Sequence, residues 1–148
     1  MKRWLPVLIL CAGLGSSFSF AQYRIVDCVE QKAVTVRRVQ GQVFDPNGVP
    51  VPGVIVSLSS EAHPDIQSKT GAAGEFSIKA RPGRYVLKAL YPNFETTRAE
   101  LDIGEDVISI FHPTALRIIL ALHGMNCPWV TANKKEFNLL NEQHRKQK

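Results

Sequence analysis

Hydrophobic and polar residues alternate with a period of two along most of this chain from Val34 onward. The alternating runs are short, rich in β-branched residues, and separated by Gly, Pro and Asn clusters at intervals of about ten residues. Because successive side chains of a strand point to opposite faces, this pattern predicts half-buried β-strands. About seven such strands predict one all-β, Greek-key sandwich. The expected strands cover residues 34–44, 54–58, 75–79, 84–91, 98–103, 107–111 and 116–122.

Three stretches depart from the strand pattern, each for a physical reason. The apolar parity shifts within residues 34–44 at Arg37 and Arg38, so we expect an interruption there. Residues 45–48 read Asp-Pro-Asn-Gly, a turn in which proline presets φ and the Asn-Gly pair tolerates positive φ. Residues 49–53 contain two prolines, which remove ladder donors and therefore predict an edge or crossing segment.

A helical pattern is confined to the end of the chain. Asn133 followed three residues later by Glu136 resembles a capping box, with Asn133 as the N-cap. Phe137, Leu140 and His144 would then share one face of a short helix. Such a helix is marginal alone. Its apolar stripe therefore either docks on the sandwich or is available to a partner.

The N-terminus has the parts of a secretory signal peptide. Lys2 and Arg3 supply a positive start, and the apolar run of residues 4–14 follows. That run has about eleven residues, whereas a membrane-spanning helix needs roughly 20. Small residues lead up to Ala21, so we expect cleavage after Ala21 and export to the periplasm or beyond. We expect no transmembrane segment in the mature chain.

Cysteine usage agrees with an oxidising compartment. Cys11 falls inside the expected signal peptide, and Leu10 stands before it where lipoprotein processing requires a small residue. Cleavage leaves Cys28 and Cys127, one near each end of the mature chain. An even count favours a disulfide in exported proteins, so we predict a bond between these two residues.

The expected organisation is a signal peptide (1–21), an N-terminal segment (22–33), one β-sandwich (34–125) and a basic, partly helical tail (126–148). The formal charge of the whole chain is +5, but the excess of basic residues in the mature chain lies in the tail. The body is neutral. A neutral body argues against a nucleic-acid partner, because nucleic acids require a basic face.

Three blocks of sequence carry a family resemblance. Residues 41–58 read GQVFDPNGVPVPGVIVSL, residues 74–78 read GEFSI, and residues 82–87 read PGRYVL, with Thr70 between the first two blocks. In order and spacing these blocks resemble carboxypeptidase regulatory-like domains, closely over residues 39–91 and loosely over 92–122. The resemblance implies a transthyretin-like or Ig-like β-sandwich of about seven strands. It also implies a non-catalytic module.

The residue patterns of the enzymes with related folds or partners are absent from the sequence. It contains no His-x-x-Glu pair for a zinc peptidase, no terminal Tyr-Arg-Gly-Ser, no His-x-His and no Gly-x-Ser-x-Gly. We therefore expect no catalytic residues, no metal site and no cofactor. One soft-metal alternative remains in His123, Met125 and Cys127, whose donors suit copper.

These observations favour an exported binding or scaffolding module with a protein partner at the cell envelope. A carbohydrate-binding module is the alternative, and its aromatic platform would be Trp129, the single tryptophan left after cleavage. An enzyme whose catalytic arrangement the sequence does not reveal is a third class. The predicted contact residues are Trp129 and the helical Phe137 and Leu140, together with His63 and Asp65 in the polar loop of residues 61–67.

Overall fold

The computed structural model describes residues 31–105, 115–124 and 126–146. No helix within these ranges is long and apolar enough to cross a membrane. The described residues form nine strands and one helix: β1 (Val34–Val36), β2 (Val39–Phe44), β3 (Ile55–Ser59), β4 (Ile66–Lys69), β5 (Glu75–Ile78), β6 (Gly83–Leu90), β7 (Thr97–Ile103), β8 (Leu116–Ile119), β9 (Trp129–Thr131) and α1 (Lys134–Lys146).

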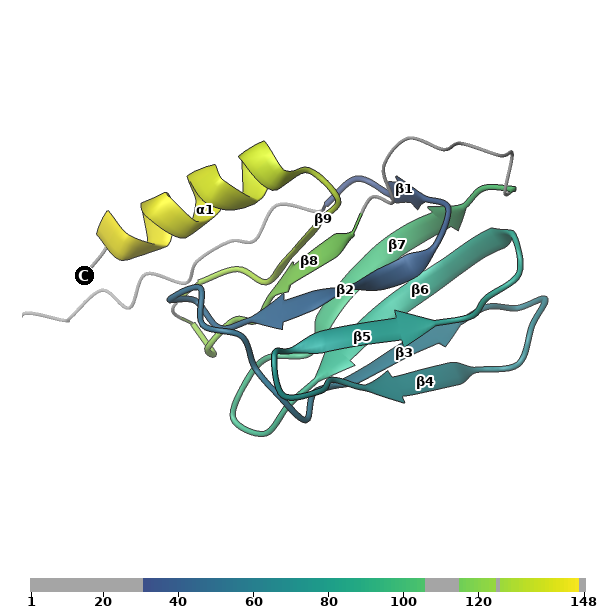
Figure 1. Ribbon diagram of the computed structural model, residues 1–148, viewed down its shortest axis with the longest axis horizontal. Helices are drawn as coiled ribbons and strands as arrows, with labels where there is room; N and C mark the ends of the chain where they lie inside the picture. Colours follow the sequence, from purple (N-terminus) through teal and green to yellow (C-terminus); the bar gives the residue numbers. More distant parts are fainter. Residues whose placement is uncertain (1–30, 106–114, 125, 147–148) are drawn as a thin grey trace, which may run out of the picture.

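The strands form two sheets that pack face to face, so the predicted all-β sandwich is confirmed (Figure 1). Sheet A has the strand order β1-β7-β6-β3-β4, and sheet B has the order β5-β2-β8-β9. Most pairs are antiparallel, but β1 pairs with β7, and β2 with β8, in parallel. The two strand orders also show that strands adjacent in the sequence often lie in different sheets, as β1 and β2 do.

The core lies between the sheets and is built by the period-two pattern of the sequence. On β6 the inward residues Tyr85, Leu87 and Ala89 are buried, and their neighbours along the strand are exposed or half-buried. β7 alternates in the same way over its whole length. Sheet B contributes its own inward side chains, so the two faces enclose one apolar layer.

The expected interruption of the first strand is a crossing between the sheets. β1 ends at Val36 in sheet A, and β2 begins at Val39 in sheet B. The parity shift at Arg37 and Arg38 thus marks the place where the chain moves from one sheet to the other. Further along β2, Gly41 permits close approach to β8, because an added Cβ would lie 1.9 Å from the Leu116 carbonyl oxygen.

The predicted turn at residues 45–48 forms around Asp45. Its Oδ1 accepts hydrogen bonds from the backbone N–H groups of Asn47 and Val49, both at 2.8 Å. Gly48 has a φ of 80°, the left-handed conformation that the Asn-Gly pair allows. The turn reverses the chain, and Val51 then donates a backbone hydrogen bond to Val43 at 2.9 Å.

Two strands were not expected from the sequence. β4 begins at Ile66 inside the predicted polar loop, and it pairs with β3 as an edge of sheet A. β9 pairs with β8 through Val130, opposite Ile118. The sandwich therefore continues through Thr131, beyond the boundary that we placed at residue 125. The strand expected at residues 107–111 lies outside the described residues.

Helix α1 begins where the capping residue predicts, but its cap differs in detail. The Asn133 Oδ1 accepts the backbone N–H of Lys135 at 2.9 Å and that of Glu136 at 3.5 Å. The Glu136 carboxylate accepts a hydrogen bond from the Thr131 hydroxyl. That hydroxyl in turn accepts the Asn133 N–H at 3.0 Å. The last residue of β9 therefore completes the cap of the helix.

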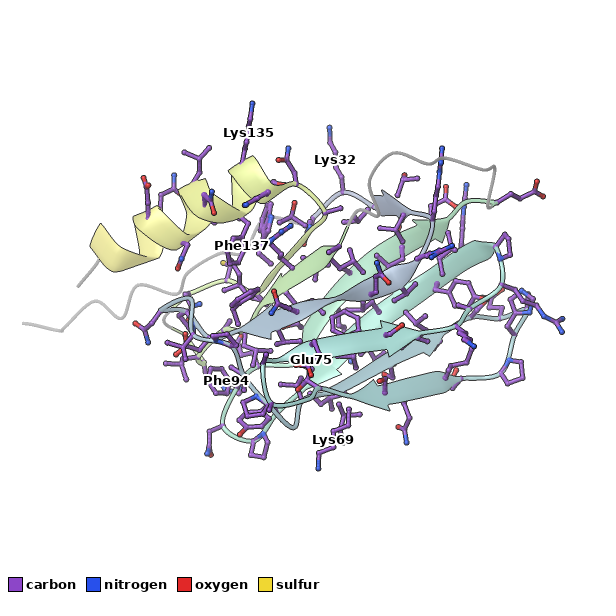
Figure 2. The ribbon with its side chains drawn as sticks, in the orientation of Figure 1. Lys32, Lys69, Glu75, Phe94, Lys135 and Phe137 are labelled. Carbon is purple, nitrogen blue, oxygen red and sulfur yellow. The ribbon has the colours of Figure 1, made fainter. Side chains whose placement is uncertain are left out.

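The apolar stripe of α1 docks on the outer side of sheet B. Phe137 is 9% exposed and lies against Phe44 of β2, with ring centroids 4.8 Å apart. The Arg117 guanidinium lies 5.7 Å from the centre of the Phe137 ring. Figure 2 shows Phe137 on the side of α1 that faces the sheet, whereas Lys135 points away from it. The remaining members of this cluster are Ile119, Trp129 and Leu140.

Gln31, which precedes β1, bonds to the outer edge of β9. The Gln31 side-chain amide donates to the Val130 carbonyl, and its Oε1 accepts the Val130 N–H at 3.0 Å. A glutamine amide has one donor side and one acceptor side, as a peptide group does. Gln31 thus makes the pair of hydrogen bonds that a neighbouring strand would make.

Candidate functional site

The two sheets differ in what covers their outer sides. Helix α1 packs on sheet B (Figure 1). Apolar side chains on the outer side of sheet A remain in contact with solvent. Ile55 and Leu90 are each 44% exposed, and Val86 is 38% exposed. We call this side the open face and define it by Ile55, Val86, Leu90, Lys69, Lys88 and Arg98.

The strand register places two cations side by side on the open face and a third, Lys69, in the neighbouring row on the edge strand β4. Lys88 of β6 lies directly opposite Arg98 of β7, and Ile55 lies between Lys69 and Leu90 in the neighbouring row. Like charges directly opposite each other destabilise a sheet. Acidic side chains follow further along β7, where Glu100 lies opposite Val86. One end of the open face is therefore cationic around an exposed apolar pair.

A separate hollow lies at the end of the sandwich where the β3–β4 and β5–β6 connections meet, on the right in Figure 1. Its volume is about 520 Å³, within the range of ~300–1,000 Å³ that small-ligand sites occupy. We call it the end hollow. It is lined by His63, Pro64, Ile66, Lys79, Ala80, Arg81 and Tyr85.

Two side chains of the end hollow form a stacked pair. The His63 imidazole is half-buried and lies parallel to the Tyr85 ring, with centroids 5.8 Å apart and an interplanar angle of 19°. Tyr85 is 3% exposed, and its hydroxyl has no hydrogen-bond partner in the structure. A buried hydroxyl without a partner costs about 1–3 kcal/mol. The Tyr85 hydroxyl is thus an unpaired donor inside the core, beneath the hollow that the His63 ring lines.

The residues predicted to contact a ligand are distributed over different parts of the fold. His63 lines the end hollow, whereas Asp65 of the same loop is exposed and does not line it. Cys127 is half-buried in the loop before β9. Cys28 lies outside the described residues, so the disulfide between Cys28 and Cys127 stays a prediction.

Trp129, Phe137 and Leu140 all belong to the cluster beneath α1. Trp129 is half-buried there, and its indole Nε1 is buried. The apolar stripe of the helix was expected either to dock on the sandwich or to bind a partner, and the structure shows it docked on the sandwich. Phe137 and Leu140 of α1 thus pack against sheet B, and Trp129 of β9 packs against the same cluster from the sheet.

The soft-metal alternative has little structural basis in the described residues. His123 is exposed in the loop after β8, and Met125 lies outside the described residues. The Asn126 Oδ1 accepts the Leu122 N–H at 2.9 Å, which closes this loop on itself. Within residues 31–105, 115–124 and 126–146, no group of three His, Cys, Asp or Glu side chains is placed to hold a metal ion.

The family model of the carboxypeptidase regulatory-like domain matches residues 38–111, which is half of the chain. The chain belongs to this family. The match includes the turn at Asp45, strands β3 to β7, the open face and the end hollow. The family match therefore confirms the resemblance that the three sequence blocks carried, and the observed β-sandwich agrees with it.

One curated relative agrees with this assignment over part of its length. The chain is 35% identical to mouse (Mus musculus) carboxypeptidase M over 65 residues, which are 44% of this chain and 14% of that protein. The chain thus spans a small part of that curated relative.

Two solved structures are similar to the chain at low identity. Klebsiella pneumoniae 5-hydroxyisourate hydrolase has a TM-score of 0.47 at 23% identity, over 63% of this chain and 94% of that one. The 3-chlorocatechol 1,2-dioxygenase of Rhodococcus opacus has a TM-score of 0.38 at 14% identity, over 71% of this chain and 59% of that one.

Sequence reasoning missed the cationic pair of the open face and the unpartnered hydroxyl of Tyr85. The outward positions of Lys88 and Arg98 follow from the alternation of their strands, but their direct opposition depends on the register of β6 with β7. Tyr85 was expected in the core, where it lies. The missing partner of its hydroxyl depends on the loops around it, which periodicity does not describe.

Proposed function

We propose that this carboxypeptidase regulatory-like domain is an exported, non-catalytic module that binds a protein partner at the cell envelope through its open face. The observation that carries the proposal is the pairing of Lys88 with Arg98 beside the exposed Ile55 and Leu90. The expected signal peptide supports the compartment.

The chemistry of the open face defines the partner. Exposed apolar side chains on a sheet that nothing described covers favour a protein surface, because burying them releases water. The opposed cations Lys88 and Arg98 cost the isolated sheet free energy, and an acidic partner would convert that cost into attraction. The proposed partner therefore presents an apolar patch bordered by Asp or Glu side chains.

A protein partner is favoured over a glycan. Sugar sites use exposed aromatic platforms, and the single tryptophan of the mature chain, Trp129, packs beneath α1. The exposed large side chains of the open face are aliphatic. No observation specifically supports the carbohydrate-binding alternative.

The proposal is tested by site-specific photo-crosslinking in cells that produce the full chain. A photoreactive residue at position 67 would lie on the open face, because Gln67 is exposed and pairs with Ser57 beside Lys88. We expect one defined cross-linked protein, and its loss in the double variant Lys88→Glu, Arg98→Glu. The control Lys135→Glu reverses a charge on the exposed side of α1 and should leave the cross-link unchanged.

Two results would contradict the proposal. One is a cross-link that persists at equal yield in the Lys88→Glu, Arg98→Glu variant, because the open face would then not carry the interaction. The other is turnover by purified residues 22–148 of a peptidase, esterase or ring-cleavage substrate that a single His or Tyr substitution abolishes.

A further inference from the structure

We propose that this chain forms a two-fold symmetric dimer in which β4 of one copy pairs antiparallel with β4 of a second copy, centred on Gln67. The inference rests on the free edge of sheet A and on the order of charges along that edge. It does not depend on the proposed function, because Lys88 and Arg98 lie on inner strands of sheet A and take no part in the pairing.

The backbone of β4 has a free side. β4 is the last strand of sheet A in the described part of the chain, so it pairs with a strand on one side only. Just after β4, the Thr70 N–H donates to the Val54 carbonyl at 2.9 Å, so the backbone groups of Thr70 point toward the β3 side. Because the backbone groups of successive strand residues point to alternate sides, those of Gln67 and Lys69 point to the free side. Asp65 precedes the strand with the same parity.

The other edges of the two sheets offer fewer groups for pairing. At β9, Gln31 bonds to both the N–H and the carbonyl of Val130. At β5, the Glu75 carbonyl already accepts the Gly71 N–H at 2.9 Å. β1 has three residues, and very short edge strands resist pairing with other chains. Among the described strands, β4 is therefore the edge best suited to accept another strand.

The charges along this edge complement a second copy of themselves. In an antiparallel pairing centred on Gln67, Lys69 lies opposite Asp65 of the second copy, and symmetry repeats the pair. Asp65, Gln67 and Lys69 are all exposed, and neither charged side chain makes an ion pair with a residue that the structure describes. Opposite charges directly across an antiparallel pair attract. The edge thus favours a second copy of this chain, in one register.

The opposite face of β4 agrees with the same register. Ile66 is half-buried and packs against the core, and it would lie opposite Ser68 of the second copy. Pairing would cover the exposed part of Ile66 and close roughly six backbone hydrogen bonds, two for each opposed pair of residues 65, 67 and 69. Because both copies use the same edge, the contact closes at two subunits and does not continue into a filament.

Analytical ultracentrifugation of the protein purified from the periplasm or medium tests the dimer between about 1 and 200 μM. We expect the mass of two chains at the upper end and dissociation on dilution. Asp65→Lys and Lys69→Glu should each raise the dimer Kd by about tenfold or more, because each places like charges opposite each other twice. The double variant Asp65→Lys, Lys69→Glu exchanges the charges and should restore the dimer. Lys88→Glu, Arg98→Glu is the control and should leave the dimer unchanged.

A cysteine at the centre of the pairing tests the register. The Cα atoms of two directly opposed, hydrogen-bonded residues lie about 5.5 Å apart, which is within the span of a disulfide. Gln67→Cys should therefore give a covalent dimer on mild oxidation. Lys69→Cys is the matched control on the same exposed edge. Its two copies would lie roughly 13 Å apart along the paired strands, so it should give no such product.

Two outcomes would overturn the inference. One is a monomer at every concentration, which would leave the edge to a strand of another protein. The other is a double variant Asp65→Lys, Lys69→Glu that associates as weakly as the single variants, because the register would then not place these residues opposite each other.

The dimer and the proposed envelope partner are told apart by their cross-links. A photoreactive residue at position 67 would also capture the second copy, in a product that contains this chain alone. That product should persist in Lys88→Glu, Arg98→Glu, whereas the product with the envelope partner should not. Failure of the dimer therefore leaves the proposed function untouched, and the reverse also holds.

Discussion

The Thr70 hydroxyl accepts a hydrogen bond from the Val54 backbone N–H at 2.8 Å, inside the core of the sandwich. The same hydroxyl donates to the Val51 carbonyl at 2.9 Å, and Thr70 is 5% exposed. A single side chain thus satisfies two backbone groups of the crossing segment before β3. Because the prolines of this segment limit its backbone pairing, the hydroxyl substitutes for a strand partner.

Replacing Thr70 by Val should lower the free energy of unfolding by roughly 1–3 kcal/mol, because it leaves a buried N–H and a buried carbonyl unpaired. Urea denaturation of residues 22–148 measures the change. Thr97→Val is the matched control, since the Thr97 hydroxyl is also buried but has no partner. That variant should be neutral or stabilising, and equal losses in both variants would contradict the role given to Thr70.

Replacing Phe137 by Ala should lower the free energy of unfolding by about 3 kcal/mol, because the ring fills the space between α1 and sheet B. Leu139→Ala removes an apolar side chain that is 62% exposed on the same helix, and it should change stability by less than about 0.5 kcal/mol. Thermal unfolding compares the two. Near-equal effects would show that the docking of α1 contributes little.

Replacing Gly41 by Ala should disrupt the pairing of β2 with β8, because the new Cβ would overlap the Leu116 carbonyl oxygen. We expect a loss of at least about 3 kcal/mol or an insoluble protein. Gly104→Ala is the control, since a Cβ at Gly104 has no neighbour within 4 Å. A soluble Gly41→Ala variant with unchanged stability would mean that the two strands separate easily.

The predicted bond between Cys28 and Cys127 should appear as a mass difference between reduced and unreduced protein purified from the periplasm or medium. A loop of this length could contribute up to ~4–5 kcal/mol in the chain-entropy model, so reduction should lower the unfolding midpoint in urea. Quantitative labelling of both thiols without prior reduction would refute the bond and return the soft-metal alternative to consideration.

The sequence predicted the parts of the fold that local chemistry determines. The turn at Asp45, the alternation of β6 and β7, and the Asn133 cap all depend on residues close together in the chain. The change of sheet at Arg37 and Arg38 was visible as a parity shift, although its meaning required the structure.

The strands that sequence reasoning missed lack the pattern on which it depends. β4 is an edge strand whose residues are exposed or half-buried. Ile66 is its one apolar side chain, so no alternation of apolar residues marks the strand. β9 has three residues, too few to show a period. The candidate sites have the same difficulty, because the opposition of Lys88 and Arg98 and the isolation of the Tyr85 hydroxyl arise from non-local pairing.

The contact between Gln31 and Val130 has a consequence for behaviour at high concentration. An exposed edge strand is a template on which a second molecule can add its own strand, and such growth leads to aggregation. Gln31 occupies the donor and the acceptor at the middle of β9, within a side chain that cannot itself extend the sheet. Because Gln31 occupies these two groups, a strand of a second molecule cannot pair with Val130 without displacing it, which disfavours edge-to-edge association at β9.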